Sequence, residues 1–239
     1  MSVVGLARAA VVVSGGPVAL VAAGVLAPVA AVRRWPERAQ PGWGRRCAWA
    51  VTGAALVAPW VYASLIRPRM QHWGATPAEI ARAFPGDIDD ALFTTTRAVT
   101  VHAPAEDVWS WLVQIGQDRG GFYSYDWLEN LAGCRLASAD RVHDEWQQRS
   151  PGDPLTIFPG YATTIGAVDP PRSLLIDSWG AYAVEPLDAT SCRLIARSHA
   201  ERGLPGAAYV LLVELPHAVM ERKMLLGIRQ RAERSRQFA

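Results

Sequence analysis

The amino-acid sequence predicts an α+β domain that follows two long apolar helices. Two stretches near the N-terminus, 9–32 and 47–66, contain no charged residue, whereas the rest of the 239-residue chain mixes apolar runs with charged and turn-forming residues. The later part has a β-like run, then helical spacing, then several short β-like runs and finally one long helical segment. We therefore expect an N-terminal anchor, 1–69, and one globular domain, 70–239.

Each apolar stretch is long enough to be a transmembrane helix, because about 20 apolar residues cross the hydrocarbon core of a bilayer. The glycines and prolines of the first stretch are tolerated in a membrane helix whose neighbours restore the backbone hydrogen bonds. Aromatic residues flank the second stretch at both ends, as in interfacial belts: Trp43, Trp49, Trp60 and Tyr62. The alternatives are a signal peptide for the first stretch or a buried hairpin for both.

The segment between the two stretches is rich in arginine, with five arginines against one glutamate in 33–46. Cytoplasmic loops carry such an excess of positive charge, so we expect this hinge on the cytoplasmic side and the globular domain on the far side. Arg67 and Arg69, which follow the second stretch, oppose this orientation. The membrane is thus an expected partner, through a multi-pass anchor with an extracytoplasmic domain.

A short helix is expected at the start of the globular domain, followed by a strand. Thr76 can cap the helix, with Pro77 in its first position and Glu79 in its third. The helix should end near Phe84. Threonine and valine are frequent in 92–102, which favours the first strand there.

Two helices should follow this strand. Pro104 begins the first, whose apolar residues recur with helical spacing: Val108, Trp111, Leu112 and Ile115. After Gly120 and Gly121 the helical spacing resumes in 125–131, which we expect to be the second, shorter helix. One face of the longer helix should lie in the core.

The remaining chain predicts an antiparallel meander closed by a long helix. Short connections separate five β-like runs: 155–158, 161–168, 174–179, 182–187 and 192–199. In the last run, apolar residues alternate with Arg193 and Arg197, so one face of that strand should be wet. The final helical segment, 206–236, should be interrupted at Pro216 and turn its apolar residues inward: Val219, Met220, Met224, Leu225 and Ile228.

The element order β-α-α-β(several)-α, together with three motifs, resembles the SRPBCC superfamily, also described as START-like or helix-grip. The motifs are APAEDVW at 103–109, QIGQDRGGFYSYDWLEN at 114–130 and MERKMLLG at 220–227. The last two are similar to those of a bacterial branch, and the resemblance covers about 70–235. It implies a curved antiparallel sheet wrapped around a long C-terminal helix, with an apolar tunnel between them. Members bind lipids, sterols, polyketides and plant hormones, and a minority act as cyclases, from which the label "polyketide cyclase-like" comes.

The most unusual segment of the chain is 119–130, where two glycines stand beside several aromatic residues. The resemblance places this segment at the mouth of the tunnel, and aromatic walls with a few polar tips suit an amphipathic ligand. The helix interruption at Pro216 could also aim His217 and Glu221 into the tunnel. The expected ligand-binding residues are therefore Trp111, Arg119, Tyr123, Tyr125, Trp127, Asn130, His217 and Glu221. The alternatives are packing roles for the aromatic residues and a surface pair for His217 and Glu221.

Two other polar clusters have simpler explanations. Asp126 and Glu129 could act as paired carboxylates, but a solvated helix face or a pairing with Arg119 or Arg141 is the favoured interpretation. A second cluster lacks any recognised metal-binding arrangement: Asp140, His143, Asp144 and Glu145. We therefore expect no metal and no cofactor.

Composition and missing motifs exclude several functions. Arginine supplies almost all the basic residues, with Lys223 the only lysine, which argues against a dedicated nucleic-acid surface. The three cysteines form no zinc or redox motif, so Cys134 and Cys192 are expected to be free thiols. No hydrolase elbow, P-loop or dinucleotide-binding fingerprint occurs in the sequence, and no residue is assigned a catalytic role.

The sequence thus predicts a membrane-anchored protein that binds a hydrophobic small molecule or a lipid in an apolar cavity. An enzyme of the cyclase or aromatase kind would need a general acid or base in the tunnel, for which His217, Glu221 and Tyr123 are candidates. A structural or partner-binding membrane subunit would instead have a solid core and a large exposed apolar patch. The sequence leaves the ligand and the oligomeric state open.

Overall fold

The computed structural model describes residues 50–235 except 51–52, 55–56, 59 and 132. The first expected membrane helix, 9–32, and the arginine-rich hinge lie outside these residues, and the second, 47–66, lies within them only in part. Among the described residues, no helix combines the length and the apolar character that a membrane crossing requires. The end of the second stretch is helical, as η1 (Tyr62–Ile66), and the helix continues without a break into α3 (Arg67–Gln71).

One sheet of six antiparallel strands forms the centre of the domain, in the order β1-β6-β5-β4-β3-β2. The strands are β1 (Ala91–Val101), β2 (Pro154–Phe158), β3 (Tyr161–Asp169), β4 (Ser173–Ile176), β5 (Gly180–Asp188) and β6 (Ser191–Glu201). Strands β2 to β6 follow one another through short connections, which is the meander expected from the sequence. The first strand then pairs with the last, in a register that places Val101 opposite Cys192.

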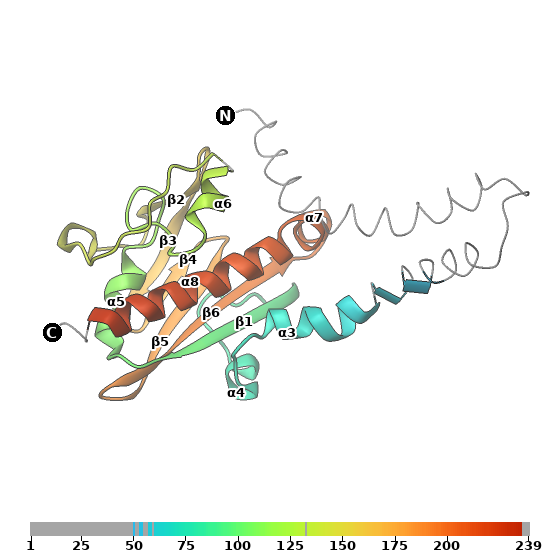
Figure 1. The fold of residues 1–239 in the computed structure, drawn as a ribbon, viewed down its shortest axis with the longest axis horizontal. Coiled ribbons are helices and arrows are strands. Elements are labelled where there is room, and N and C mark those ends of the chain that lie inside the picture. Colours follow the sequence, from blue (N-terminus) through green and yellow to red (C-terminus); the bar gives the residue numbers. More distant parts are fainter. Residues whose placement is uncertain (1–49, 51–52, 55–56, 59, 132, 236–239) are drawn as a thin grey trace, which may run out of the picture.

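Helices pack around this sheet, and the longest crosses it (Figure 1). They are α4 (Pro77–Ala81), α5 (Ala105–Val113), α6 (Asp126–Leu131), η2 (Asp144–Trp146), α7 (Leu204–Leu212) and α8 (Glu214–Ser235). The α+β class and the order of elements expected from the sequence are confirmed. A curved antiparallel sheet with a long C-terminal helix across it is consistent with the helix-grip fold.

The main hydrophobic core fills the space between the sheet, α5 and α8. Alternate residues of the strands point into it, among them Val99 of β1 and Leu194 of β6. Trp111 meets them from α5, and Leu225 and Ile228 meet them from α8. The inward spacing of 3 residues between Leu225 and Ile228 is that of one helix face, so the sequence pattern and the packing agree.

A second, smaller core lies on the opposite face of the sheet. Phe84 packs there against Ala98 of β1 and Ile195 of β6. The expectation that one face of β6 is wet is therefore wrong, since Arg197 on this face is only 4% exposed. The reason is that the chain segment containing α4 folds back and covers this face.

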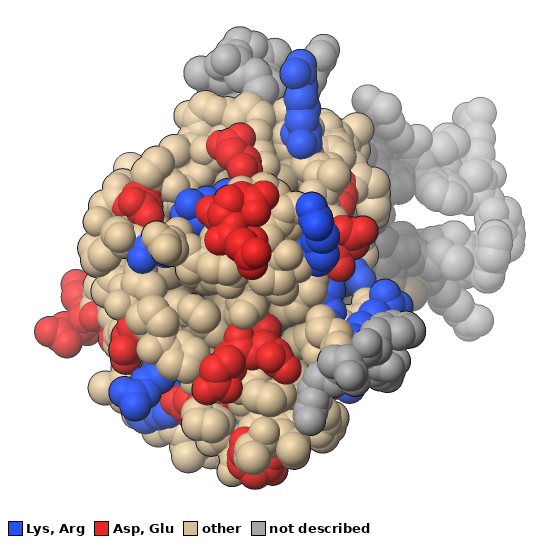
Figure 2. All heavy atoms as spheres, turned by 90° about the vertical axis from the view of Figure 1, so that its left-hand side faces the viewer, with Lys and Arg blue, Asp and Glu red and all other residues tan. Residues whose placement is uncertain are grey.

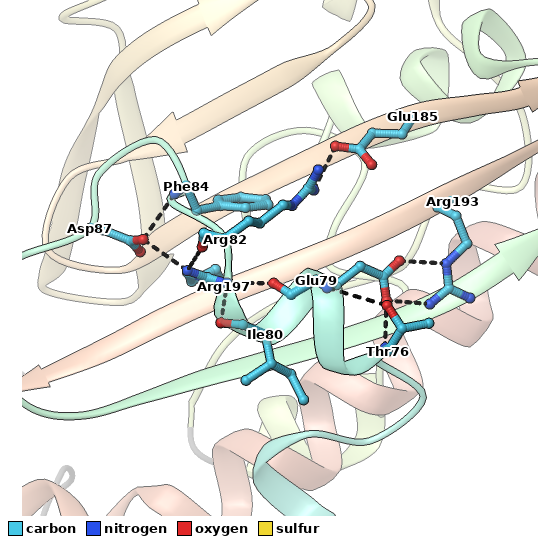
Figure 3. A network of polar contacts seen from close by, with 9 residues as sticks. All are labelled: Thr76, Glu79, Ile80, Arg82, Phe84, Asp87, Glu185, Arg193 and Arg197. Carbon is cyan, nitrogen blue, oxygen red and sulfur yellow. Dashed lines mark hydrogen bonds and ion pairs between the residues drawn. The ribbon is translucent and has the colours of Figure 1, made fainter.

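Polar contacts fasten that segment to β6 (Figure 3). Thr76 and Glu79 form the expected capping box at the start of α4. The two carboxylate oxygens of Glu79 accept hydrogen bonds from Arg193, each at 2.8 Å. Arg197 donates to Asp87 at 2.8 Å and to the carbonyl of Glu79 at 2.7 Å. We call these five residues the outer clamp: Thr76, Glu79, Asp87, Arg193 and Arg197.

The last helical segment differs from the expectation in two details. The break falls at Val213, between α7 and α8, rather than at Pro216. Proline is compatible with the first turn of a helix, where the backbone N–H groups lack helical partners, so Pro216 lies within the start of α8. Val219 was expected to point inward but is 45% exposed. The inward face is set by Ala218 and Glu221, which are both buried.

Candidate functional site

A group of polar side chains is buried between the sheet and the first half of α8. We call it the inner cluster: Arg97 of β1, Tyr182 of β5, Ser198 of β6, Tyr209 of α7, and His217 and Glu221 of α8. Arg97, Tyr182 and Glu221 are 1%, 2% and 3% exposed, respectively. The apolar side chains of the main core continue from the cluster along α8. The cluster is thus the polar end of an otherwise apolar interior.

An ion pair between Arg97 and Glu221 lies at the centre of the inner cluster. Arg97 Nη1 donates to Glu221 Oε2, and Arg97 Nε donates to the carbonyl of Met70 at 2.9 Å. Ser198 Oγ lies 3.5 Å from the other carboxylate oxygen, Oε1. Moving the two charges out of water costs several kcal/mol per ion, and only close pairing and further hydrogen bonds offset that cost. The pair therefore fixes β1 against α8, and neither partner is stable there alone.

His217 is the member of the cluster whose hydrogen bonding is incomplete. Its Nδ1 is hydrogen-bonded to the hydroxyl of Tyr209, and its ring meets the ring of Trp179 at a centroid distance of 5.1 Å. Its Nε2 lies 3.6 Å from Glu221 Oε1 and has no hydrogen-bond partner among the described residues. Burial lowers the pKa of His217, although the Glu221 carboxylate acts in the opposite direction. The imidazole is therefore neutral at pH 7 and presents one ring nitrogen without a protein partner.

The two tyrosines of the cluster remain protonated. Burial raises the pKa of both Tyr182 and Tyr209, and the nearby Glu221 carboxylate raises it further. The Tyr182 hydroxyl accepts a hydrogen bond from Trp179 Nε1 at 3.1 Å. At neutral pH the cluster consequently offers uncharged donors and acceptors beside a single ion pair.

A second buried carboxylate ties this end of α8 to α3. Glu214 is 1% exposed and accepts hydrogen bonds from Arg67 Nε at 2.9 and 3.0 Å and from Gln71 Nε2 at 2.7 Å. The guanidinium of Arg67 also lies over the ring of Phe93, 4.9 Å from its centroid. We call Arg67, Gln71 and Glu214 the anchor joint, because Arg67 directly follows the apolar stretch 47–66.

Of the eight expected ligand-binding residues, the inner cluster contains two, His217 and Glu221. Tyr123 and Trp111 lie in the main core, edge to face, with ring centroids 5.7 Å apart. Gln114 Nε2 donates to the Tyr123 hydroxyl at 2.7 Å. Burial raises the pKa of Tyr123, so this phenol also stays protonated. In this structure both aromatic residues have packing roles.

Three of the other expected residues lie in or near α6. Trp127 is 68% exposed, so it does not pack this helix onto the sheet. Asn130 bonds both polar groups of the Leu136 backbone, at 2.7 and 2.9 Å. Arg119 donates to two backbone carbonyls in and just after η2, both at 3.3 Å. The side chains of Asn130 and Arg119 therefore form hydrogen bonds that stabilise loop backbone.

Tyr125, the eighth expected residue, lines a surface pocket of about 130 Å³ beside α8. Arg222 lies over the Trp73 ring on one wall, and Lys223 lies over the Tyr125 ring on another, at 4.7 and 5.8 Å from the centroids. Pockets for drug-sized ligands measure about 300–1,000 Å³. This pocket is therefore large enough for a small chemical group but not for a whole lipid.

Glu129 corrects another expectation, since it is only 7% exposed and not part of a solvated helix face. Burial raises the pKa of Glu129 to about 7, and the neighbouring Asp126 adds to the shift. Asp126 itself accepts hydrogen bonds from Ser138. One oxygen of the Glu129 carboxylate, Oε2, has no partner within the described part of the chain.

The expected free thiols are confirmed, because Cys134 and Cys192 are both buried and unpaired. Burial raises the pKa of Cys192 to about 12, so it is an unreactive thiol. Among the described residues, no three His, Cys, Asp or Glu side chains are grouped so that they could hold a metal ion. In the acidic cluster near η2, His143 pairs with Glu145 at 3.1 Å.

Sequence reasoning missed the partners of His217 and Glu221. The position of Arg97 could have been predicted. Side chains alternate between the two faces of a strand, so Arg97 points to the same face of β1 as Val99 and Val101, which is the core face. The position of Tyr209 could not have been predicted, because it depends on how the chain turns at Val213 between α7 and α8. The inner cluster is thus a product of tertiary packing.

The comparisons with known proteins give structural likenesses at low identity. No protein-family model matches the chain, and no curated protein matches it. Among the similar solved structures is the Zhui aromatase/cyclase of Streptomyces sp. R1128, with 18% identity and a TM-score of 0.33 over 59% of this chain and 94% of that chain. A polyketide cyclase-like protein of Corynebacterium glutamicum has 14% identity and a TM-score of 0.33 over 63% of this chain and 97% of that one. A protein of Mycobacterium smegmatis has 15% identity and a TM-score of 0.34 over 64% and 97%. Likenesses at this level say nothing about the activity of this chain.

Proposed function

We propose that the globular domain binds a hydrophobic small molecule that carries a polar group, and that the N-terminal part of the chain holds the domain at a membrane. The observation that supports binding most directly is the unpartnered Nε2 of His217 at the polar end of an apolar core. Buried polar atoms in native proteins nearly always have a partner. A hydroxyl or carbonyl group of a bound molecule would supply the missing hydrogen bond.

The charge states of the inner cluster favour binding over proton transfer. The pKa of His217 is lowered and that of Tyr209 is raised, so neither group changes its protonation near pH 7. General acids and bases work best when their pKa lies near the working pH. Neutral groups with fixed orientations instead suit the recognition of an uncharged polar group on an apolar ligand.

A cyclase-like enzyme is the second candidate, and one specific contact favours it. Tyr209, His217 and Glu221 form a row in which the two nitrogens of the imidazole face a phenol and a carboxylate. In such a row, the carboxylate orients the imidazole, and the imidazole can take the proton of the phenol. The row would act on a hydrophobic substrate bound at the same place.

Membrane attachment is proposed from the way the chain enters the domain. The helix that closes the apolar stretch 47–66 continues into α3, and Arg67 is bonded to the buried Glu214. The domain would therefore sit directly on the end of the anchor. The extracytoplasmic side remains the proposed location, from the arginine-rich hinge.

Native mass spectrometry of the full chain, released from host membranes in mild detergent, tests the binding proposal. We expect the wild-type protein to carry a stoichiometric hydrophobic molecule that organic extraction identifies. The His217→Phe variant should lose it, whereas Trp127→Phe, changed at an exposed site, should keep it. A wild-type protein without a bound molecule overturns the proposal. The enzyme hypothesis would be favoured if the wild-type protein converts its bound molecule to a product during incubation and the Tyr209→Phe variant does not.

A further inference from the structure

Helix α7 is unusual among the helices of this domain because it has no charged residue and yet lies at the surface. No charged residue occurs from Leu204 to Val213. Leu204 at the start of α7 is 87% exposed, and Val213 at its C-terminal end is 45% exposed. Surface helices of soluble proteins normally turn charged or polar residues to the water. The side chains that α7 exposes are therefore apolar at Leu204 and beside its end at Val213.

Helix α7 lies at the end of the domain from which the helix of η1 and α3 extends (Figure 1). Two contacts connect these helices. Arg67 is hydrogen-bonded to Glu214, the first residue of α8. The ring of Phe93 contacts both the guanidinium of Arg67 and the ring of Tyr209 in α7, with 5.9 Å between the two ring centroids. On the apolar stretch 47–66, Trp60, Leu65 and Ile66 are 65%, 46% and 50% exposed. One end of the molecule thus carries apolar side chains from two elements far apart in sequence.

The opposite end of the domain has a different surface. Figure 2 views that end and shows acidic and basic side chains distributed over it. Strand β6 connects the two ends, because it begins at Ser191 in the β5–β6 turn and finishes at Glu201, just before α7. An 11-residue strand spans about 33 Å at about 3.3 Å per residue, so the apolar and the charged ends are well separated.

We propose that α7 and the start of α8 dock on the surface of a lipid bilayer, an inference that rests on the membrane attachment proposed above. Because the stretch 47–66 ends one residue before the anchor joint, a membrane that holds this stretch has its surface at the level of α7. The nine residues of α7 extend about 14 Å, which is too short to span the hydrocarbon core, so the helix lies in the plane of the interface. Leu204 inserts among the acyl chains, and Tyr209 on the inner side of the helix keeps its hydrogen bond to His217.

Photo-crosslinking of the full chain in lipid nanodiscs tests this docking. Benzoylphenylalanine is placed at one of three exposed positions in separate variants, and the discs contain phosphatidylcholine and phosphatidylglycerol. The positions are Leu204 on α7, Trp60 in the apolar stretch and Leu187 near the β5–β6 turn. All three side chains are more than half exposed, so the variants should keep the wild-type melting temperature. We expect lipid adducts at 204 and 60, and only background at 187.

The other outcomes separate the two proposals. Lipid adducts at 60 without adducts at 204 would overturn the docking and leave the membrane attachment standing. Absence of lipid adducts at both positions would overturn the attachment, and the docking with it. Three further outcomes would overturn the docking. Equal yields of lipid adducts at 204 and 187 would mean that the labelling of α7 is unspecific. A crosslink from 204 to a second copy, or to residues 1–49 of the same chain, would mean that α7 has another partner.

Discussion

The two faces of the sheet both carry a buried arginine–carboxylate contact, and the two contacts serve different ends. In the outer clamp, Arg193 directs its guanidinium to Glu79, to Thr100 and to the carbonyl of Gly74, so all its groups are engaged by neighbours. In the inner cluster, Glu221 pairs with Arg97 and also faces His217, whose Nε2 has no partner in the described structure. Within the clamp, Arg193 and Glu79 thus form a closed set of contacts that holds a short helix, whereas Nε of Arg197 has no partner among the described residues. The cluster holds more polar groups than its ion pair needs, which is what a binding site requires.

The largest effect is expected from breaking the inner ion pair. The Glu221→Leu variant leaves Arg97 buried without a counter-charge, which costs about 3–5 kcal/mol of unfolding free energy. The double variant Arg97→Met with Glu221→Leu should recover most of that loss, because both charges leave together. Denaturant unfolding of the full chain in detergent, followed by circular dichroism, measures both. Additive losses would contradict a coupled pair.

Glu129 extends the comparison to a buried carboxyl group with no cation. Because its pKa is raised to about 7, the folded state keeps the proton between the ordinary pKa of about 4.3 and pH 7. Stability should therefore fall as the pH rises through this window and stay lower above it. Glu129→Gln should stabilise the protein by about 2 kcal/mol at pH 8 and leave it unchanged at pH 4. Melting temperatures at the two pH values test this, and a gain at both would refute the assigned cause.

The outer clamp should show the opposite dependence on pH. Burial alone would raise the pKa of Glu79, but the hydrogen bonds from Arg193 and Thr76 outweigh it and lower the pKa. The stability from this carboxylate is present above about pH 4.3 and is lost as the pH falls through the lowered value. Glu79→Gln should cost about 1 kcal/mol at pH 7 and speed hydrogen exchange in 76–87, whereas Asp89→Asn, at an exposed position, should not. Unchanged exchange in Glu79→Gln would mean that Phe84 alone holds the segment.

The smallest effect on stability is expected at His217. Glutamine at this position can keep one hydrogen bond to Tyr209, so His217→Gln should cost about 1 kcal/mol at pH 7. Because burial lowers the pKa of His217, the wild-type protein should lose stability as the pH falls below about 6.5, and the variant should not. Melting curves of both proteins between pH 5 and pH 8 measure the difference. Parallel curves would show that the imidazole is not held neutral.

Much of the fold could be predicted because local patterns determine it. The strands follow from β-branched runs between turn residues, and α4 follows from the capping box of Thr76 and Glu79. The covering of β6 could not be predicted, since the alternation around Arg197 is the same whether a strand faces water or a short helix. The break at Val213 could not be predicted either. Proline is the stronger local sign of a helix break, yet Pro216 is compatible both with a break at its own position and with the first turn of a helix that begins just before it.

The site was harder to predict than the fold, because its members come from five elements. His217 and Glu221 share one helix, so their spacing is visible in the sequence. Tyr209 meets His217 only after α7 turns back, and Arg97 meets Glu221 only across the sheet. The aromatic residues of 119–130 gave the strongest composition signal, yet Tyr123 is a core residue and Trp127 is a surface residue. Unusual composition marked the segment without showing which way its side chains face.

The unbroken helix through residues 60–71 leaves no linker between the apolar stretch and the domain. Arg67 and Gln71 are separated by about 6 Å of helix at about 1.5 Å per residue, and Glu214 is hydrogen-bonded to both of them. On a membrane, the domain would have a fixed height and orientation above the bilayer. A domain on a flexible linker, in contrast, can move through the nearby solution. A molecule would then reach the inner cluster by lateral diffusion within the bilayer, and its supply would depend on its concentration per membrane area.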